Sequence, residues 1–79
     1  MAQTPSTPDL LKAIQKLQSD LGRLQLQCSD EDRAFWALGV AYEALHGAWW
    51  ELNTGPGAGL QRIEEAIREY RARYVKPGS

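Results

Sequence analysis

His46, the only histidine of the chain, is the residue that could most readily take part in metal binding or acid–base catalysis. Glu43 precedes it by three positions, so on a helix the two side chains share a face and could form a partial metal site or an acid–base pair. Two ligands from one helix are too few to hold a metal ion, and no second histidine can complete the set. The sequence therefore predicts no catalytic residue, no metal site and no cofactor, and we expect that the protein is not an enzyme.

Two further groups have only part of what a binding site needs. The segment from Gly55 to Gly59 is rich in glycine and precedes a helical pattern, but it lacks the strand, the G-x-x-x-x-G-K-[ST] spacing and the lysine of a phosphate-binding loop. Arg71, Arg73 and Lys76 follow three glutamates on the same segment, and the formal net charge is -1, whereas nucleic-acid binders need excess positive charge. We expect a turn, a solvated helix end and no nucleic-acid partner.

Length and composition restrict the class of protein further. The 79 residues make one domain, whose single core gives only about 3–5 kcal/mol of stability, so partners are a natural reinforcement. The one cysteine, Cys28, excludes an intramolecular disulfide and fits a reducing compartment, with pairing between two chains as the alternative.

No apolar run reaches the roughly 18 residues of a membrane span, and residues 1–9 lack the basic and apolar regions of a signal peptide. We expect a cytoplasmic protein without a membrane partner.

The first two helical segments are predicted from start signals and apolar spacing. Thr7 with the proline and aspartate after it starts the first helix. Gly22 should weaken this helix without breaking it. Ser29 with the three acidic residues after it indicates a capping box, from which a second helix runs to about Asn53. The seam of the first helix, spaced by four and three residues, is Leu10, Ile14, Leu17, Leu21, Leu24 and Cys28.

A third helix follows the glycine- and proline-rich turn at 54–59, and either Pro56 or Gly59 opens it. Its apolar residues are Leu60, Ile63, Ile67, Tyr70 and Tyr74, and Pro77 with Gly78 ends it. Because short connections favour antiparallel neighbours, the predicted fold is all-α, a three-helix up-down-up bundle with the central helix packed on both neighbours. Residues 1–8 are expected to be a flexible tail, 9–76 a single helical domain and 77–79 the C-terminal end.

The central helix carries large apolar residues on every side. If Leu38, Leu45 and Leu52 take heptad position a, alanines fill position d and aromatic residues position e. Such a face suits a helix that touches two neighbours, one of them closely, and it predicts the core. The predicted core comprises Leu38, Leu45, Leu52, Ala34, Ala41, Ala48, Phe35, Tyr42 and Trp49, flanked by Ala37, Ala44 and Glu51.

The opposite side of the same helix is too apolar for a surface that faces water. It has two tryptophans, a valine and two glycines where a solvated helix carries charged residues. Tryptophan is a frequent hot spot of protein interfaces, and glycine lets another backbone approach. We predict that a protein partner or a second copy covers this tryptophan stripe, the alternative being the N-terminal tail or the glycine-rich loop. The stripe consists of Trp36, Gly39, Val40, Glu43, His46, Gly47 and Trp50.

The stretch from Pro56 to Glu69 reads PGAGLQRIEEAIRE. It resembles the C-terminal segment of a family of small phage inhibitors of type I CRISPR surveillance complexes, which reads P-G-x-G-L-x-R-I-E-x-A-x-x-E. The resemblance covers about a fifth of the chain and implies a phage or mobile-element origin and a non-enzymatic blocking role. That family pairs its helix with a β-sheet, whereas no segment before Pro56 alternates like a strand.

The sequence as a whole favours a non-enzymatic protein-binding module, an anti-CRISPR or other phage-type inhibitor that occludes a site on a host protein complex. The alternative is a homo-oligomeric structural subunit or adaptor whose apolar stripe is its own dimer interface. The residues expected to bind the partner are Trp36, Gly39, Val40, Glu43, Gly47, Trp50, Arg62, Glu64 and Arg68.

Overall fold

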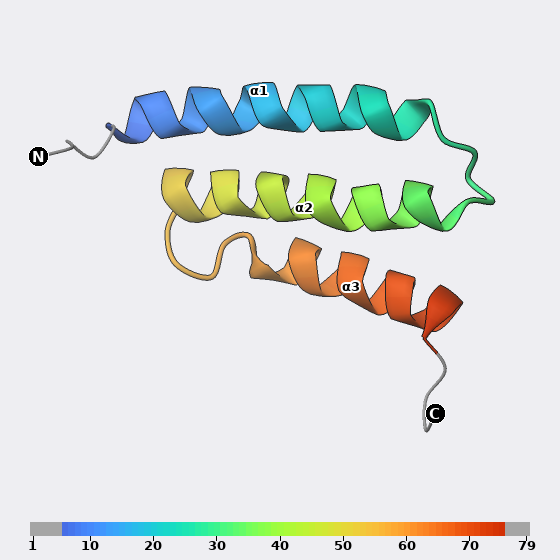
Figure 1. The fold of residues 1–79 in the computed structure, drawn as a ribbon. Coiled ribbons are helices and arrows are strands. Elements are labelled where there is room, and N and C mark those ends of the chain that lie inside the picture. The colour runs from blue at the N-terminus through green and yellow to red at the C-terminus, as the bar shows by residue number, and fades with distance from the viewer. Residues whose placement is uncertain (1–5, 76–79) are drawn as a thin grey trace, which may run out of the picture.

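The computed structural model describes residues 6–75, which form three helices and, within that range, no strand. Helix α1 spans Thr7–Leu26, α2 spans Arg33–Asn53 and α3 spans Leu60–Tyr74. Figure 1 shows the helices side by side, each antiparallel to the next, with α2 in the middle. The predicted all-α, up-down-up arrangement with a central helix packed on both neighbours is confirmed.

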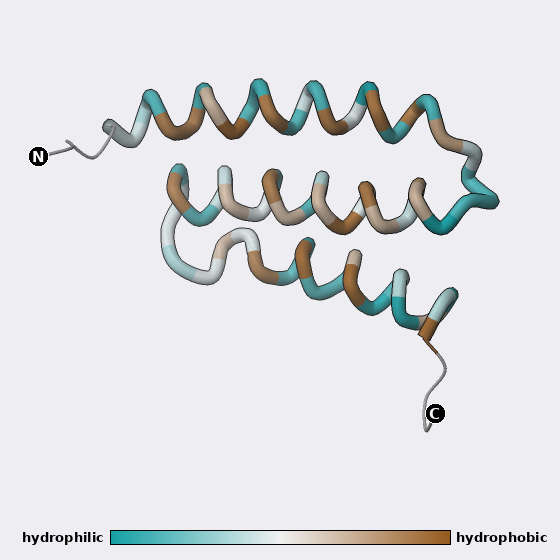
Figure 2. The backbone as a smooth tube through the Cα atoms, in the orientation of Figure 1, coloured by the Kyte–Doolittle hydropathy of each residue, from teal (hydrophilic) through white to brown (hydrophobic). Residues whose placement is uncertain are grey.

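The bundle is an open layer and does not close around a core. Helix α2 contacts both α1 and α3, whereas the two outer helices do not contact each other in the described part of the chain. Each outer helix therefore covers only one side of α2. Among residues 6–75 no hydrophobic side chain is buried, although apolar residues occur along all three helices (Figure 2). The layer consequently has two broad faces.

The start of α1 follows the expected chemistry with a shift of one residue. Ser6, and not Thr7, is the N-cap, and its Oγ accepts a hydrogen bond from the Asp9 N–H at 3.4 Å. The helix continues through Gly22 as predicted, and a Cβ at that glycine would lie 3.1 Å from Cε2 of Tyr42. Residues 1–5 and 76–79, which include most of the predicted tail and the predicted C-terminal end, lie outside the described residues.

The predicted capping box at Ser29 is wrong. Asp32 is the N-cap of α2, and its side chain makes no capping hydrogen bond. Ser29 instead closes a turn, because its Oγ accepts from the N–H of Glu31 at 3.2 Å and its carbonyl oxygen accepts from the N–H of Asp32 at 3.0 Å. The Trp36 side chain fixes this loop, since its Nε1 donates to the carbonyl oxygen of Asp30 at 2.8 Å.

The junction between α2 and α3 is a close contact of two glycines. Gly59 is the N-cap of α3, one of the two predicted starts, and a Cβ on it would overlap the backbone of Gly47. The carboxylate of Glu51 accepts hydrogen bonds from the N–H groups of Gly57 and Gly59, both at 2.8 Å. A negative charge at a helix N-terminus is favourable. Glu51, although it belongs to α2, therefore stabilises the N-terminus of α3 as a capping side chain would. Gly57 has φ of 90°, which a side chain would strain.

The predicted core is not enclosed by the chain. Leu38 and Leu45 are half-buried, and Leu52 is 45% exposed. The alanines at positions 34, 37 and 41 are also exposed. The reason is that α3 packs on the side of α2 where Gly47 leaves room for its backbone, and not on the leucine side. Gly47, one residue of the tryptophan stripe, is thus covered by α3. The sequence does not predict this contact.

Candidate partner-binding groove

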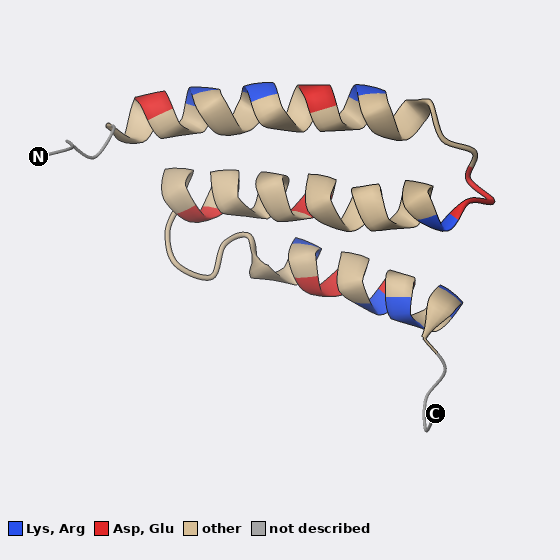
Figure 3. Ribbon diagram, in the orientation of Figure 1, with Lys and Arg blue, Asp and Glu red and all other residues tan. Residues whose placement is uncertain are grey.

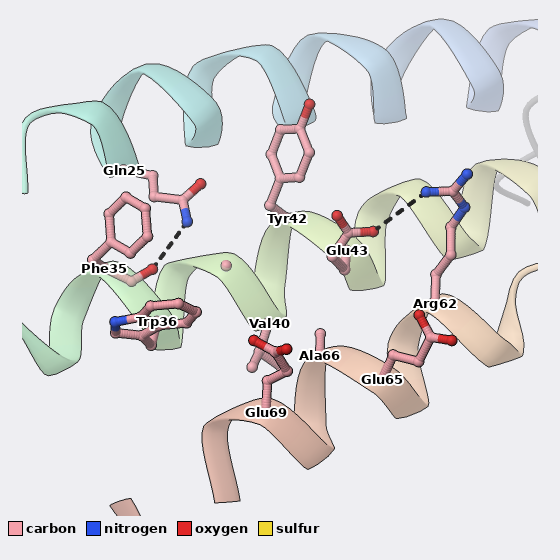
Figure 4. A pocket seen from close by; sticks show the side chains of 11 residues that line it. Gln25, Phe35, Trp36, Val40, Tyr42, Glu43, Arg62, Glu65, Ala66 and Glu69 are labelled. Carbon is pink, nitrogen blue, oxygen red and sulfur yellow. Dashed lines mark hydrogen bonds and ion pairs between the residues drawn. The ribbon is translucent and has the colours of Figure 1, made fainter. Parts of the chain in front are cut away.

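A groove of about 420 Å³ runs along one face of the layer (Figure 4). Helix α2 forms its floor, and α1 and α3 form its two walls. The lining residues are Gln25 from α1, Phe35, Trp36, Gly39, Val40, Tyr42 and Glu43 from α2, and Arg62, Glu65, Ala66 and Glu69 from α3. The groove therefore depends on all three helices, and it combines aromatic, aliphatic and charged side chains.

The aromatic end of the groove is held in place by its neighbours. The rings of Phe35 and Trp36 meet edge to face, with centroids 5.4 Å apart and an interplanar angle of 74°. Gln25 Nε2 donates to the carbonyl oxygen of Phe35 at 3.0 Å, and the indole of Trp36 is tied to Asp30 as described above. The guanidinium of Arg73 lies 3.6 Å from the centroid of the Trp36 ring, a cation–π contact. The two rings are thus oriented by the chain itself.

The α3 wall of the groove is charged. Arg62 Nη1 lies 3.9 Å from Glu43 Oε2, and the two side chains are 52% and 33% exposed. An ion pair this accessible contributes only about 0–1 kcal/mol to stability, so its charges remain available to a partner. Glu65 and Glu69 extend from the same wall (Figure 4). The lining residues include three carboxylates and one guanidinium, and Arg73 on the Trp36 ring adds a second guanidinium at the aromatic end. The balance stays negative, which favours positively charged side chains.

The helices on either side of the groove carry more charged residues than α2, which forms its floor. Figure 3 shows charged residues along α1 and α3 and few on α2. A partner that enters the groove therefore meets an apolar floor between charged helices. This is the usual order of a protein interface, in which a core poor in charge is surrounded by a polar rim.

Several of the residues predicted to bind a partner come together in the groove, namely Trp36, Gly39, Val40, Glu43 and Arg62. Glu64 and Arg68 do not line it. Arg68 instead borders a second, smaller depression on α3 together with Arg73, and Glu64 is exposed. The predicted charged face of α3 is thus divided between the groove and open surface.

Gly47 and Trp50, also predicted to bind a partner, lie within the helix packing. Gly47 is buried, and a Cβ on it would come within 2.7 Å of the Ile63 side chain. Trp50 is half-buried, with its ring 6.3 Å from that of His46 and tilted by 31°. Its Nε1 and that of Trp49 are buried without a hydrogen-bond acceptor among the described residues, at a cost of about 1–3 kcal/mol each. Gly47 is thus covered by α3, whereas Trp50 keeps part of its ring exposed and its indole nitrogen buried.

Sequence reasoning missed most of what the outer helices contribute to the groove. Arg73 was assigned to a solvated helix end, whereas its guanidinium lies on Trp36. Gln25 of α1 is not among the predicted site residues, and Phe35 and Tyr42 of α2 are predicted as core. A usable signal existed on α3, where the lining residues recur at spacings of three, four and seven, the mark of one helix face. These residues are Arg62, Glu65, Ala66 and Glu69.

The arrangement offers contacts and little reactive chemistry. Within residues 6–75, no three His, Cys, Asp or Glu side chains lie close enough together to hold a metal ion. Cys28 Sγ makes a weak hydrogen bond to the carbonyl oxygen of Leu24 at 3.8 Å. In the same part of the chain, no helix combines the length and the apolar character that crossing a membrane requires. No family model matches the chain, and neither a curated protein nor a solved structure is significantly similar to it.

Proposed function

We propose that the protein is a non-enzymatic binding module that holds a segment of a partner protein in the groove over α2. The observation that supports this most is the pair of rings of Phe35 and Trp36, fixed edge to face at one end of an open groove. Anchors that are already oriented reduce the ordering cost of binding. Tryptophan in such a position is the commonest kind of interface hot spot.

The groove favours a partner segment that carries both apolar and basic side chains. Apolar groups find Trp36 and Val40 on the floor, and basic groups find the carboxylates of Glu65 and Glu69 on the wall. Charges at the rim of an interface mainly set the association rate and the choice of partner, whereas the desolvated rings supply most of the affinity. The partner we propose is therefore a helical or extended protein segment of positive charge.

The role we propose for this binding is inhibition by occlusion, with the phage-type inhibitors as the model. The segment from Pro56 to Glu69, which resembles their C-terminal segment, includes every residue that α3 contributes to the groove. Three of these groove residues, Arg62, Ala66 and Glu69, occupy defined positions of the shared pattern. In this chain α3 packs on the helix α2, whereas that family uses a β-sheet, so the proposal concerns a shared blocking role and not a shared fold.

The alternative, a homo-oligomeric structural subunit or adaptor that pairs through the tryptophan stripe, has less support. Gly47 is buried against α3 within one chain, and Trp50 is half-buried beside His46. Gly47, one of the residues that such an interface needs, is therefore already covered by α3.

A pair of charge swaps tests the proposed function. The groove variant carries Arg62→Glu with Glu69→Arg, and the control carries Lys16→Glu with Asp20→Lys on the exposed side of α1, so the net charge is unchanged in both. Proteins retained from a bacterial lysate by the wild type are identified by mass spectrometry, and the Kd of the purified partner is then measured by calorimetry.

The proposal expects that the wild type and the control bind one protein equally and that the groove variant binds it about tenfold more weakly or worse. Circular dichroism should show the same helix content in all three chains. If the groove variant and the control have the same Kd, the groove is not the binding site and the proposed function is wrong.

A further inference from the structure

The face of the layer opposite the groove carries an unbroken apolar stripe on α2. At 100° per residue its members fall within an arc of about 80°, centred about 160° around the helix from Gly39 and Glu43 in the groove floor. None of them is buried, and Leu52 at one end is 45% exposed. This alanine–leucine stripe consists of Ala34, Leu38, Ala41, Leu45, Ala48 and Leu52.

Both outer helices add large apolar side chains to the same face. On α3, Leu60, Ile67 and Tyr74 recur every seven residues and are 49%, 37% and 37% exposed. They lie about 150° around the helix from the residues that α3 contributes to the groove. On α1, Leu17 and Leu24 are 55% and 49% exposed. They lie about 150° around the helix from Gly22, which meets the groove residue Tyr42. Together with the alanine–leucine stripe they form an apolar surface. The stripe at its centre contains no charged residue, and Glu64 and Arg71 lie beside the α3 residues at its edge.

We propose that a second copy of this chain covers this surface, with the two α2 helices antiparallel about a twofold axis. The alanine–leucine stripe is complementary to itself in that arrangement. When Ala41 of one copy lies opposite Leu45 of the other, each remaining leucine also faces an alanine: Leu38 faces Ala48, and Leu52 faces Ala34. A large side chain opposite a small one lets two helices pack closely, and the twofold axis makes every such contact twice.

The size of the surface matches what a stable dimer needs. The 21 residues of α2 make a helix about 31 Å long, and three helices spaced by 8–10 Å make a layer about 25 Å wide. The face of the layer that carries this surface therefore has an area on the order of 800 Å² per copy, which is the usual contribution of one partner to a specific interface. Pairing of two copies would also enclose Leu38 and Leu45, which one chain leaves half-buried.

The absence of charge on the alanine–leucine stripe favours a second copy over a foreign partner. Interfaces between different proteins commonly use complementary charges to select the partner, and the centre of this surface offers none. The interfaces of homodimers are more apolar than those between independent proteins. The groove lies on the other face, so a dimer leaves it open in both copies.

Charge complementation tests both the surface and the register. The single variants Ala41→Glu and Leu45→Lys each place unpaired charges in the proposed interface, whereas the double variant places each introduced carboxylate opposite an introduced ammonium of the second copy. Light scattering at micromolar concentration should give the mass of a dimer for the wild type and the double variant, and of a monomer for each single variant. Lys16→Glu on α1 is the matched control and should remain a dimer.

Circular dichroism must first show that the variants fold. As a second measurement, the chain with Cys28→Ser, Ala41→Cys and Leu45→Cys should form a disulfide-linked dimer on mild oxidation. A wild type that stays monomeric at the highest soluble concentration overturns the proposal, as does a dimer that Trp36→Ala dissociates and Ala41→Glu does not. A folded double variant that stays monomeric, with no disulfide-linked dimer, also overturns it. Binding of a partner in the groove is unaffected by Ala41→Glu, so the two proposals fail separately.

Discussion

Gly47 of α2 and Gly59 at the N-terminus of α3 are in backbone contact, and neither position has room for a side chain. This contact decides which side of α2 receives α3. It places the aliphatic and charged residues of α3 along the tryptophan stripe, where they complete the groove, and it leaves the opposite side of α2 uncovered. Two residues without side chains therefore determine where both surfaces of the layer lie.

Replacing Gly59 with alanine should destabilise the protein strongly. The new Cβ would overlap the backbone of Gly47, which cannot move aside without shifting a helix, so we expect the free energy of unfolding to fall by about 2 kcal/mol or more. Gly39→Ala is the matched control. Its Cβ would lie 3.0 Å from Nε2 of Gln25, the mobile end of a side chain, and alanine favours the helix. Urea unfolding should show a change within about 1 kcal/mol for the control. Equal losses would contradict this account of the junction.

Glu51→Gln should loosen the connection between α2 and α3. The substitution removes the charge that accepts hydrogen bonds from Gly57 and Gly59, and we expect a loss of about 1–2 kcal/mol in the free energy of unfolding. Amide hydrogen exchange at the two glycines should accelerate. Glu64→Gln is the control, because it changes the net charge by the same amount at an exposed position. It should change stability by less than about 0.5 kcal/mol. Unchanged exchange at both glycines would show that the carboxylate does not hold the loop.

The contact between Trp36 and Arg73 can be measured with a double-mutant cycle. We expect Trp36→Leu and Arg73→Met to be coupled by about 0.5–1 kcal/mol, the range of an exposed cation–π contact. Methionine keeps the apolar stem of the arginine, so the cycle isolates the charge. The same cycle with Arg71→Met in place of Arg73→Met should give no coupling, and a coupling of equal size there would remove the special role of Arg73.

Leu45→Ala should weaken the protein in a way that depends on protein concentration. A fully buried leucine costs about 2–5 kcal/mol when truncated, and Leu45 is only half-buried within one chain. If a second copy covers it, the Tm of the wild type rises with concentration, and Leu45→Ala reduces that rise. Ile14→Ala, at a half-buried position of α1, should lower Tm but keep its dependence on concentration. Calorimetric scans at low and high micromolar concentration make the comparison.

Trp36→Ala should weaken binding of the partner by about 2 kcal/mol or more, mainly through faster dissociation, because it removes a fixed aromatic anchor. His46→Ala and Cys28→Ser change residues that do not line the groove and should leave the Kd unchanged. Surface plasmon resonance with the purified partner gives both rates. The reverse result, with binding lost in His46→Ala and kept in Trp36→Ala, would require a chemical site around His46.

The number, order and direction of the helices could be predicted from the sequence because apolar spacing and glycine- or proline-rich breaks are local signals. The start of α3 at Gly59 was one of two predicted starts. The start of α2 was misplaced, because Ser29 has the residue pattern of a capping box but is used in a turn. The same loop also contains the hydrogen bond from Trp36 to Asp30, which the residue pattern of a capping box does not indicate.

The side of α2 that α3 covers could not be predicted, because both sides are apolar. Periodicity within α2 alone does not say how the helix is rotated against its neighbours. The contact of Gly47 with Gly59 joins residues on two elements, and so does the stacking of Arg73 on Trp36. Part of the groove could still be predicted, since Trp36, Gly39 and Val40 are too apolar or too small for a solvated helix surface.

The lack of contact between α1 and α3 in the described chain has a consequence for local unfolding. Each outer helix is held only by its own contact with α2, so one can detach while the other stays in place. Native-state hydrogen exchange should then resolve two cooperative units with separate opening free energies, one for α1 and one for α3. Since the groove needs all three helices, its lifetime is set by whichever outer helix opens more often.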